Sequence, residues 1–586
     1  MESPFDNTPF SESGLSFLEP EYLGDLFAPQ AVPYSTSHLE SAESLDSNAI
    51  PSNGTSDTII PACHNLFDTK GHFSFNEQLF VDSKMPTTQL LSNSYISPKL
   101  GYSVTTSPGD QCMSEMNESR VKTRQNSLIK DTILDSIEQH CHRQRLGKND
   151  HLLHTLEKVM TQNVTIYPPE IFGGLEVNVD DFTTHRKLMF DCIDVCLSDQ
   201  LGVSVFLDRE SLESAVHDAL GQLSCSMPTE ALAHMVLALG THFLHCEGRC
   251  ERLPEFQYNP LLQFNAALKI KEQLLNGAFS VQSLQALIAM TYFGLLIESK
   301  EARSLLFDCI QYSQIMRLNR SSSINALCAT LDDRRRVKKA FWFLYAMEKR
   351  FCLRAETFPL LNHDFIDHEP PKPEGHSASV DWLSILCHHA SLCAFILQEF
   401  YGQRALQSQG SSYISDLEEQ LRKLMQRLPS ELQLVDGQMV GLNMMRSQER
   451  RVKIHIFCLY YEILLAVYAK QTSAESLAVT DLNMWPSCGD QQQTSAVKKL
   501  LEASYQFTAA DVRLDMSFYQ LIRVASCKLA ASTVCDGNNN KDLSYLSIAV
   551  GFFGRMAIGD IDGPHEEVTE IVRIVHQLAK ENHDNH

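Results

Sequence analysis

Four side chains that could bind a metal ion lie close together near one predicted helix end. His242, His245 and Cys246 have the spacings of three and four residues that place side chains along one side of a helix, and Cys250 follows four residues later. Imidazole nitrogens and thiolates are ligands that zinc takes in proteins. The run is mixed with apolar residues of the stretch 235–244, which is typical of a core helix. We therefore predict buried structural side chains here and no metal site.

The remaining cysteines support the same interpretation. Seventeen cysteines are spread through the chain without the paired spacings of a disulfide framework or a zinc site. Cys192 and Cys196 continue an apolar helical stripe, whereas the side chains of residues 140–142 (His-Cys-His) would point in different directions from a helix. The first ten residues have neither the basic nor the apolar segment of a secretion signal. We expect buried free thiols in a reducing compartment, the cytosol or the nucleus.

The sequence offers no motif for catalysis. It contains no nucleophile elbow, no zinc-peptidase helix, no phosphate-binding loop and no pair of carboxylates in a plausible site setting. Its most apolar windows, such as 456–469, are about 10 to 14 residues long, whereas a bilayer span needs roughly 18 to 20. We therefore predict that the chain is not an enzyme, requires no cofactor and does not enter a membrane.

An almost continuous helical pattern must position every candidate side chain. Apolar residues recur at helical spacing from about residue 180 onward, without strand alternation and without a repeat of constant period. The predicted helices cover residues 180–199, 209–223, 228–246, 260–277, 280–298, 300–318, 332–354, 378–405, 414–428, 444–471, 493–534, 542–558 and 564–582. The sequence thus predicts an all-α fold, a multi-helix bundle over residues 166–586. Short amphipathic helices at 128–141 and 152–160 precede it, in a linker at 120–165.

The predicted helix at 332–354 is the most informative, because one face is apolar and the other is strongly cationic. In chain order its distinctive residues are Arg334, Arg335, Arg336, Phe341, Trp342, Tyr345, Glu348 and Arg350. With this series the sequence resembles the fungal-specific transcription factor domain, the helical middle homology region of zinc-cluster regulators. In that family a run of arginines precedes Phe-Trp, an aliphatic-Tyr step and an acid-basic pair. The resemblance implies a helical bundle of the same type.

The resemblance extends to both sides of this helix, over roughly residues 180 to 480. Upstream, residues 283–287 fit the family's Gln-aliphatic helix. Downstream, the family's Pro-bearing turn and acidic, isoleucine-containing stretch are represented by Pro359, Asp364, Ile366 and Pro370. The sequence departs from the family at the Leu-Gly-Leu-His element, where residues 315–320 lack the glycine and the histidine. It departs again at the Gly-Arg-Pro turn, where only the proline remains in residues 356–359.

What the resemblance implies is a nuclear regulator of transcription, commonly of metabolic or biosynthetic genes, whose helical domain is a regulatory and inhibitory module. Typical members begin with a six-cysteine binuclear zinc cluster built from Cys-x-x-Cys pairs. Before residue 150 this sequence has cysteine only at Cys63, Cys112 and Cys141. We therefore expect a regulator or coregulator without its own zinc-cluster DNA reader. Two alternatives stay open: a truncated gene model whose zinc-cluster segment lies upstream of Met1, and a helical ligand-sensing protein without catalysis.

Residues 1–119 differ in composition from the rest of the chain. They carry sixteen Asp and Glu against three Lys, and they are rich in Ser, Thr, Asn and Pro. Such a stretch cannot bury enough apolar area to offset about 1 to 2 kcal/mol of backbone entropy per residue, so we predict disorder. Near its start, acids are interleaved with apolar residues, as in activation domains; the alternative is a tail that only adds solubility. The candidate activation segment comprises Phe5, Phe10, Phe17, Leu18, Tyr22, Leu23, Leu26 and Phe27.

Charge and domain organisation together predict the partners. The chain has a net charge of −23, whereas proteins that bind DNA on their own carry clusters of basic residues. We therefore expect this chain to reach DNA through a DNA-bound partner regulator. The acidic segment would contact the transcription machinery. The helical domain would bind a small-molecule effector or a second copy of the chain.

Overall fold

A computed structural model of the chain describes residues 149–162, 164, 166–167, 186–221, 225–248, 259–372, 380–401, 411–439, 441–478, 491–536 and 540–584. These residues all belong to Gly71–His586, which forms one structural unit. The predicted disordered region 1–119, with its candidate activation segment, and the predicted helix 128–141 lie outside the described residues.

The described residues form α-helices, short 3-10 helices and an isolated bridge between Val435 and Gln438, and they contain no β-strand. The first helices are α4 (Asn149–Thr161), α5 (Arg186–Ser198), α6 (Arg209–Gly221), α7 (Met227–Cys246), α8 (Pro260–Asn276), α9 (Val281–Leu296), α10 (Ala302–Ile315), α11 (Ser321–Leu327) and α12 (Leu331–Ala355). The later ones are α13 (Trp382–Tyr401), α14 (Ser411–Gln426), α15 (Ser447–Ala478), α16 (Gln491–Ala503), α17 (Ala509–Leu514), α18 (Ser517–Asp536), α19 (Asn540–Ile558) and α20 (His565–Asp584). The 3-10 helices are η6 (Val203–Val205), η8 (His363–Phe365), η10 (Leu442–Met444) and η11 (Ser504–Gln506). For this part of the chain the all-α prediction is confirmed.

The prediction of one helix over 493–534 is wrong, because local capping divides this stretch into α16, α17 and α18. The Thr508 hydroxyl accepts a hydrogen bond from the Asp511 N–H, and the Asp511 carboxylate accepts one from the Thr508 N–H at 2.8 Å. This capping box starts a new helix. Asp515 then leaves the helical conformation, with φ −149° and ψ 103°. The short helix α11 was not predicted, since seven residues are too few to show a helical period.

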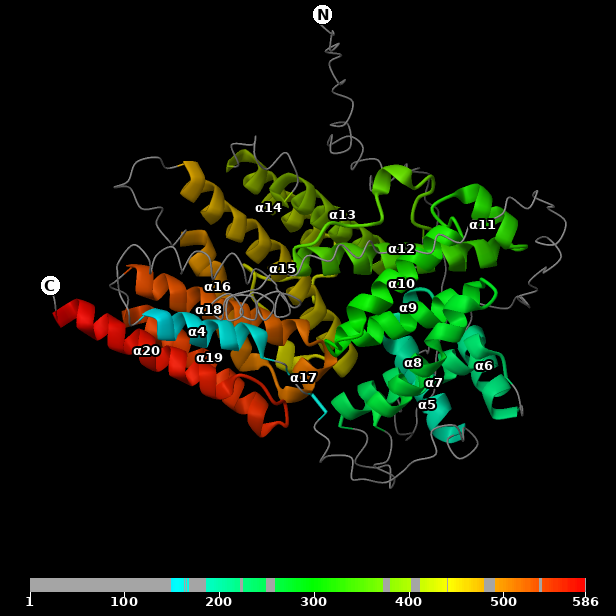
Figure 1. The fold of residues 1–586 in the computed structure, drawn as a ribbon, viewed down its shortest axis with the longest axis horizontal. Helices are drawn as coiled ribbons and strands as arrows, with labels where there is room; N and C mark the ends of the chain where they lie inside the picture. The colour runs from blue at the N-terminus through cyan, green and yellow to red at the C-terminus, as the bar shows by residue number, and fades with distance from the viewer. Residues whose placement is uncertain are drawn as a thin grey trace, which may run out of the picture. The chain divides into compact units, whose positions relative to one another are not determined.

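One hydrophobic core runs through the described helices, from Leu152 in α4 to Leu578 in α20. Helices α5, α8 and α9 pack on α7, whereas α13 packs on α12 and then on α15. Helix α4, which precedes the predicted bundle, lies against α18 and α20, as the cyan and red ribbons of Figure 1 show. The linker helix predicted at 152–160 is therefore an integral part of the C-terminal helices. No described helix has the length and apolar character that a bilayer span requires.

Gly240 allows the close approach of α5 and α7. A Cβ added at this position would overlap the Cys192 side chain and would lie 2.6 Å from the α-carbon of Cys192. Gly551 in α19 differs, because it is exposed and a Cβ there would meet only the Arg555 Nη1, at 3.7 Å. Close helix packing therefore requires the glycine at position 240, whereas position 551 has room for a side chain.

We expect Gly240→Ala to destabilise the protein by about 1 to 3 kcal/mol through overpacking. Gly551→Ala should instead stabilise it, by roughly 0.5 to 1 kcal/mol, because alanine lowers the entropy cost of an exposed helix position. Urea unfolding of the two variants and the parent checks both signs. Equal midpoints for Gly240→Ala and the parent would contradict the described packing of α5 on α7.

Candidate functional site

Helix α12 carries the residues of the predicted family motif, and most of its aromatic side chains are buried. Trp342 is 2% exposed, and its Nε1–H donates to His368 Nδ1 at 3.1 Å. The other ring nitrogen of His368 therefore carries the proton and donates to the Leu318 carbonyl at 2.8 Å. Burial lowers the pKa of His368. Trp342 thus joins α12 to the loop after η8 and to the segment after α10.

The acid-basic pair of the motif fixes the Pro-bearing turn that follows α12. The Glu348 carboxylate is fully buried and accepts hydrogen bonds from the Leu360 and Leu361 N–H groups, the second at 2.9 Å. Lys349 Nζ donates to Glu348 at 2.8 Å and to the Leu361 carbonyl. Burial lowers the pKa of Lys349, although the Glu348 charge opposes this shift. The pair therefore satisfies the backbone around Pro359, which is half-buried in this turn.

The three arginines at the start of α12 have partners within the protein. Arg336 Nε lies 2.7 Å from Asp208 Oδ2, at the turn before α6. Arg334 donates to the Cys328 carbonyl at 3.2 Å, and Arg335 donates to the Lys372 carbonyl at 3.4 Å. The cationic face predicted for this helix is thus partly used to hold neighbouring turns.

Two residues in the segments that depart from the family's pattern have a left-handed backbone. Arg317, in the segment that replaces the Leu-Gly-Leu-His element, has φ 53°. Glu356, in the segment that replaces the Gly-Arg-Pro turn, has φ 50° and ends α12 in the left-handed conformation. Such a φ favours glycine and costs other residues about 1 kcal/mol or more. Both residues therefore lie just after a helix in a conformation that glycine would adopt at lower cost.

Arg350 is the centre of a buried charge network. Its Nε and Nη2 each lie 2.8 Å from an oxygen of Glu462 in α15, so the two groups form a bidentate pair. The same Nη2 donates to the Ser517 hydroxyl at 2.9 Å. Arg350 Nη1 lies 3.4 Å from His455 Nε2, which accepts because a guanidinium can only donate. One side chain of α12 therefore contacts both α15 and the start of α18.

A second arginine, one turn further along α12, completes the network. Arg354 Nη2 donates to Glu298 at 2.6 Å, and its Nη1 donates to Ser517 at 3.1 Å. His455 Nδ1 lies 2.7 Å from Asp515 Oδ2. Side chains of α12, α15, α18 and the segments after α9 and α17 thus share one set of polar contacts.

The pKa values of the carboxylates in this network are shifted in opposite directions. Burial by itself raises the pKa of Glu462, but the Arg350 charge and hydrogen bonds outweigh it and hold that pKa below its usual value. Burial also opposes ionisation of Asp515, yet Arg350 and His455 hold its pKa well below the usual range. At Glu298 burial dominates over Arg354 and raises the pKa. Glu462 and Asp515, which lie beside Arg350, therefore stay ionised to a lower pH than Glu298 does.

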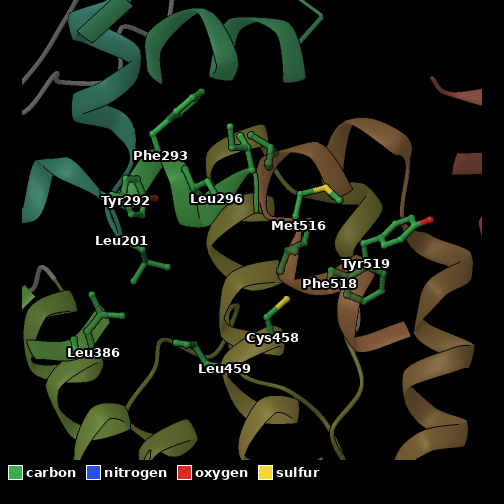
Figure 2. Close-up of a cluster of buried hydrophobic side chains, with 14 of the residues drawn as sticks. Leu201, Tyr292, Phe293, Leu296, Leu386, Cys458, Leu459, Met516, Phe518 and Tyr519 are labelled. Atoms are coloured by element: carbon green, nitrogen blue, oxygen red, sulfur yellow. The ribbon is translucent and has the colours of Figure 1, made fainter. Parts of the chain in front are cut away.

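A cavity of about 50 Å³ lies beside these charges. Its polar lining comes from Tyr292, Arg350, Arg354, His389, His455, Asp515 and Ser517. Its apolar lining includes Leu201, Leu296, Phe343, Met347, Leu386 and Leu459. Figure 2 shows Leu201, Tyr292, Leu296, Leu386 and Leu459, which come from four different helices or turns. Burial lowers the pKa of the His389 imidazole to about 4, so this ring contributes no charge to the cavity at neutral pH.

A second hollow, of about 200 Å³, lies beside the segment that follows α12, and of the downstream motif residues Ile366 lines it. It lies between the end of α10, α12 and η8, with Phe341 and Ile366 among its lining residues. Phe365 at its edge is 61% exposed. Asp364 is exposed and Pro370 is half-buried. These motif residues form a loop on the surface and are separate from the Arg350 network.

Of the residues considered as metal ligands, His242 and Cys246 are buried near the end of α7, and His245 is half-buried. His242 Nδ1 lies 2.6 Å from the Tyr167 hydroxyl, and its ring packs edge-on against Phe293. Burial lowers the pKa of His242 to about 3. Cys246 is buried, and Cys250 lies outside the described residues. Within the described ranges no group of three or more potential ligands converges.

Sequence reasoning placed Arg350 in a motif but missed its partners. Glu462, His455 and Ser517 are 105 to 167 residues away along the chain. The available signal was the presence of a carboxylate within the apolar stretch around Glu462, since such a group needs a buried partner.

Comparison with known proteins agrees with the motif. Residues 206–390 match the model of the fungal specific transcription factor domain, which confirms the resemblance. The chain is 25% identical over 465 residues to the fumonisin cluster-specific transcription factor of Gibberella moniliformis, a match covering 73% of this chain and 68% of that protein. It is 27% identical to the AAl-toxin cluster-specific transcription factor of Alternaria alternata, over 63% of this chain and 59% of that protein.

A third relative, the terrein cluster-specific transcription factor of Aspergillus terreus, is 23% identical over 50% of this chain and 46% of its own length. The matches thus span from about half to about two thirds of these three relatives. No solved structure matches the chain.

We expect Arg350→Met to destabilise the protein by about 3 to 5 kcal/mol, because it leaves the Glu462 carboxylate buried without its ionic partner. Arg422→Met is the matched control, since Arg422 pairs with Glu419 on the exposed face of α14. It should cost less than about 1 kcal/mol. Thermal or urea unfolding measures both. Similar losses in the two variants would show that the Arg350 pair has no special energetic role.

Proposed function

We propose that this chain regulates the transcription of a biosynthetic gene cluster. The observation that carries the proposal is the match of residues 206–390 to the fungal specific transcription factor domain. The relatives support the finer statement, because three of them are named as cluster-specific transcription factors and are similar well beyond that domain. A nuclear location and the absence of catalysis are part of the same proposal.

In this proposal the chain has three parts. Residues 1–119 form an acidic activation region that recruits the transcription machinery, and residues 166–586 form the helical regulatory domain. Residues 120–165 form the linker between them, whose helix α4 packs on the C-terminal helices of that domain. The sequence has no Cys-x-x-Cys pair before residue 150, so the proposal assigns DNA reading to a DNA-bound partner regulator. A zinc-cluster segment encoded upstream of Met1 is the second candidate source of DNA binding.

Deleting the gene should lower the transcripts of one contiguous set of biosynthetic genes, and reintroducing the parent chain should restore them. The measurement is genome-wide transcript sequencing under conditions that induce the cluster. Complementation with Arg422→Met should also restore expression, because this change leaves the core intact. If the transcripts of every gene cluster stay unchanged after deletion, the proposal is wrong.

Fusing residues 1–119 to a heterologous DNA-binding module should activate a reporter gene. Changing Phe17, Tyr22, Leu26 and Phe27 to alanine should remove most of that activity, because the apolar side chains would enter the groove of a partner. A control variant with the same composition but a scrambled residue order distinguishes the effect of the residue pattern from the effect of net charge. Equal activity of the scrambled and parental fusions would show that the segment acts only through its acidic composition.

A further inference from the structure

The cavity beside Arg350 lies where separate parts of the fold meet. Its walls come from α9, α12, α13 and α15, and from the Asp515–Ser517 segment at the start of α18. Met516 in that segment donates its N–H to the Leu296 carbonyl at the end of α9, at 3.3 Å. A molecule bound here would therefore contact helices that are distant in the sequence.

The polar side of the cavity has more hydrogen-bond donors than the described residues use. A guanidinium carries five N–H groups. Of those on Arg354, two donate to described residues, one to Glu298 and one to Ser517. Because Arg354 lines the cavity, an acceptor placed in it can complete this set. Among the described lining residues, Asp515 already accepts from His455 and from the Ser517 N–H.

The charges around the cavity are balanced. Three arginines, Arg350, Arg354 and Arg523, act on the three carboxylates Glu298, Glu462 and Asp515. An added carboxylate would introduce an unpaired negative charge into a buried neutral network, and an ammonium group would find each nearby carboxylate already paired. A neutral acceptor such as a carbonyl oxygen uses the remaining N–H groups without disturbing this balance.

The opposite wall is apolar and limits the size of the occupant. Phe343, Met347, Leu386 and Leu459 offer hydrocarbon surface. The volume of about 50 Å³ is small compared with pockets for drug-sized ligands, which measure about 300 to 1,000 Å³. Since a cavity of about 150 Å³ holds benzene, this volume suits a carbonyl group with only a few carbon atoms attached.

We propose that this cavity binds the carbonyl end of a small, neutral, mainly apolar molecule, with the carbonyl oxygen accepting from Arg354 and the hydrocarbon lying against Phe343 and Met347. The proposal goes beyond the transcriptional role and does not depend on it. Occupancy would strengthen the contacts that join α9, α12 and the start of α18.

The test uses the purified full-length chain and acetone, a small neutral ketone, as the probe. The methionine methyl groups are labelled with carbon-13, and Met347 is assigned through Met347→Leu. The Met347 signal should shift at acetone concentrations of about tens of millimolar, because a ligand with about four non-hydrogen atoms binds weakly. The signal of the exposed Met444 should stay in place. Absence of a Met347 shift, or an equal shift with acetate or isopropylammonium, which match acetone in size but carry a charge, overturns the proposal.

A second arm fills the cavity. Ala346 on α12 lines the cavity, so Ala346→Leu should weaken acetone binding at least tenfold. Ala355→Leu, at the end of the same helix and outside the cavity lining, should leave binding unchanged. Circular dichroism and cooperative unfolding establish that each variant is folded. If Ala346→Leu does not fold, the Met347 titration of the parent chain still decides. Undiminished binding in folded Ala346→Leu would show that the ligand binds elsewhere and would contradict the proposal. Because every readout is binding in vitro, failure here leaves the gene-deletion result untouched.

Discussion

An arginine can stay inside a helical core only when its charge and its N–H groups are matched by fixed partners, and this constraint organises the centre of the structure. Arg350 meets it with both oxygens of Glu462 and with the Ser517 hydroxyl. Losing either member of the ion pair leaves an uncompensated charge in a medium of low dielectric, which is far more costly than losing an exposed pair. The packing of α12 against α15 and α18 is therefore specified more tightly than apolar contact alone would require.

Helix α12 consequently has three distinct tasks along its length. Its first turns hold the turn before α6 through Arg336 and Asp208. Its middle buries Trp342, whose N–H fixes the loop after η8 through His368. Its last turns carry the Glu348–Lys349 pair, which satisfies the following turn, and the Arg350 network. A displacement of α12 would therefore change all of these contacts together.

The linker helix α4 gives the domain a physical connection to the chain that precedes it. Lys158 Nζ lies 2.5 Å from Glu567 in α20, and Arg523 in α18 donates to the Gln162 carbonyl at 3.0 Å. Apolar residues of α4, such as Leu152 and Leu156, are fully buried in the same core. The C-terminal helices therefore anchor the segment that leads to the acidic region.

The sequence by itself determined the helical class, most helix positions and the identity of the α12 motif, because apolar periodicity and the order of residues are local properties. It failed where local capping overrode periodicity, as at Thr508 and Asp511. Only the tertiary structure decided that Arg350 pairs with Glu462, that a cavity lies beside the pair, and that Arg317 and Glu356 have a left-handed backbone. The physical reason is that a side chain's partner depends on which helices pack together, and residues more than a hundred positions apart carry no mutual signal in a single sequence.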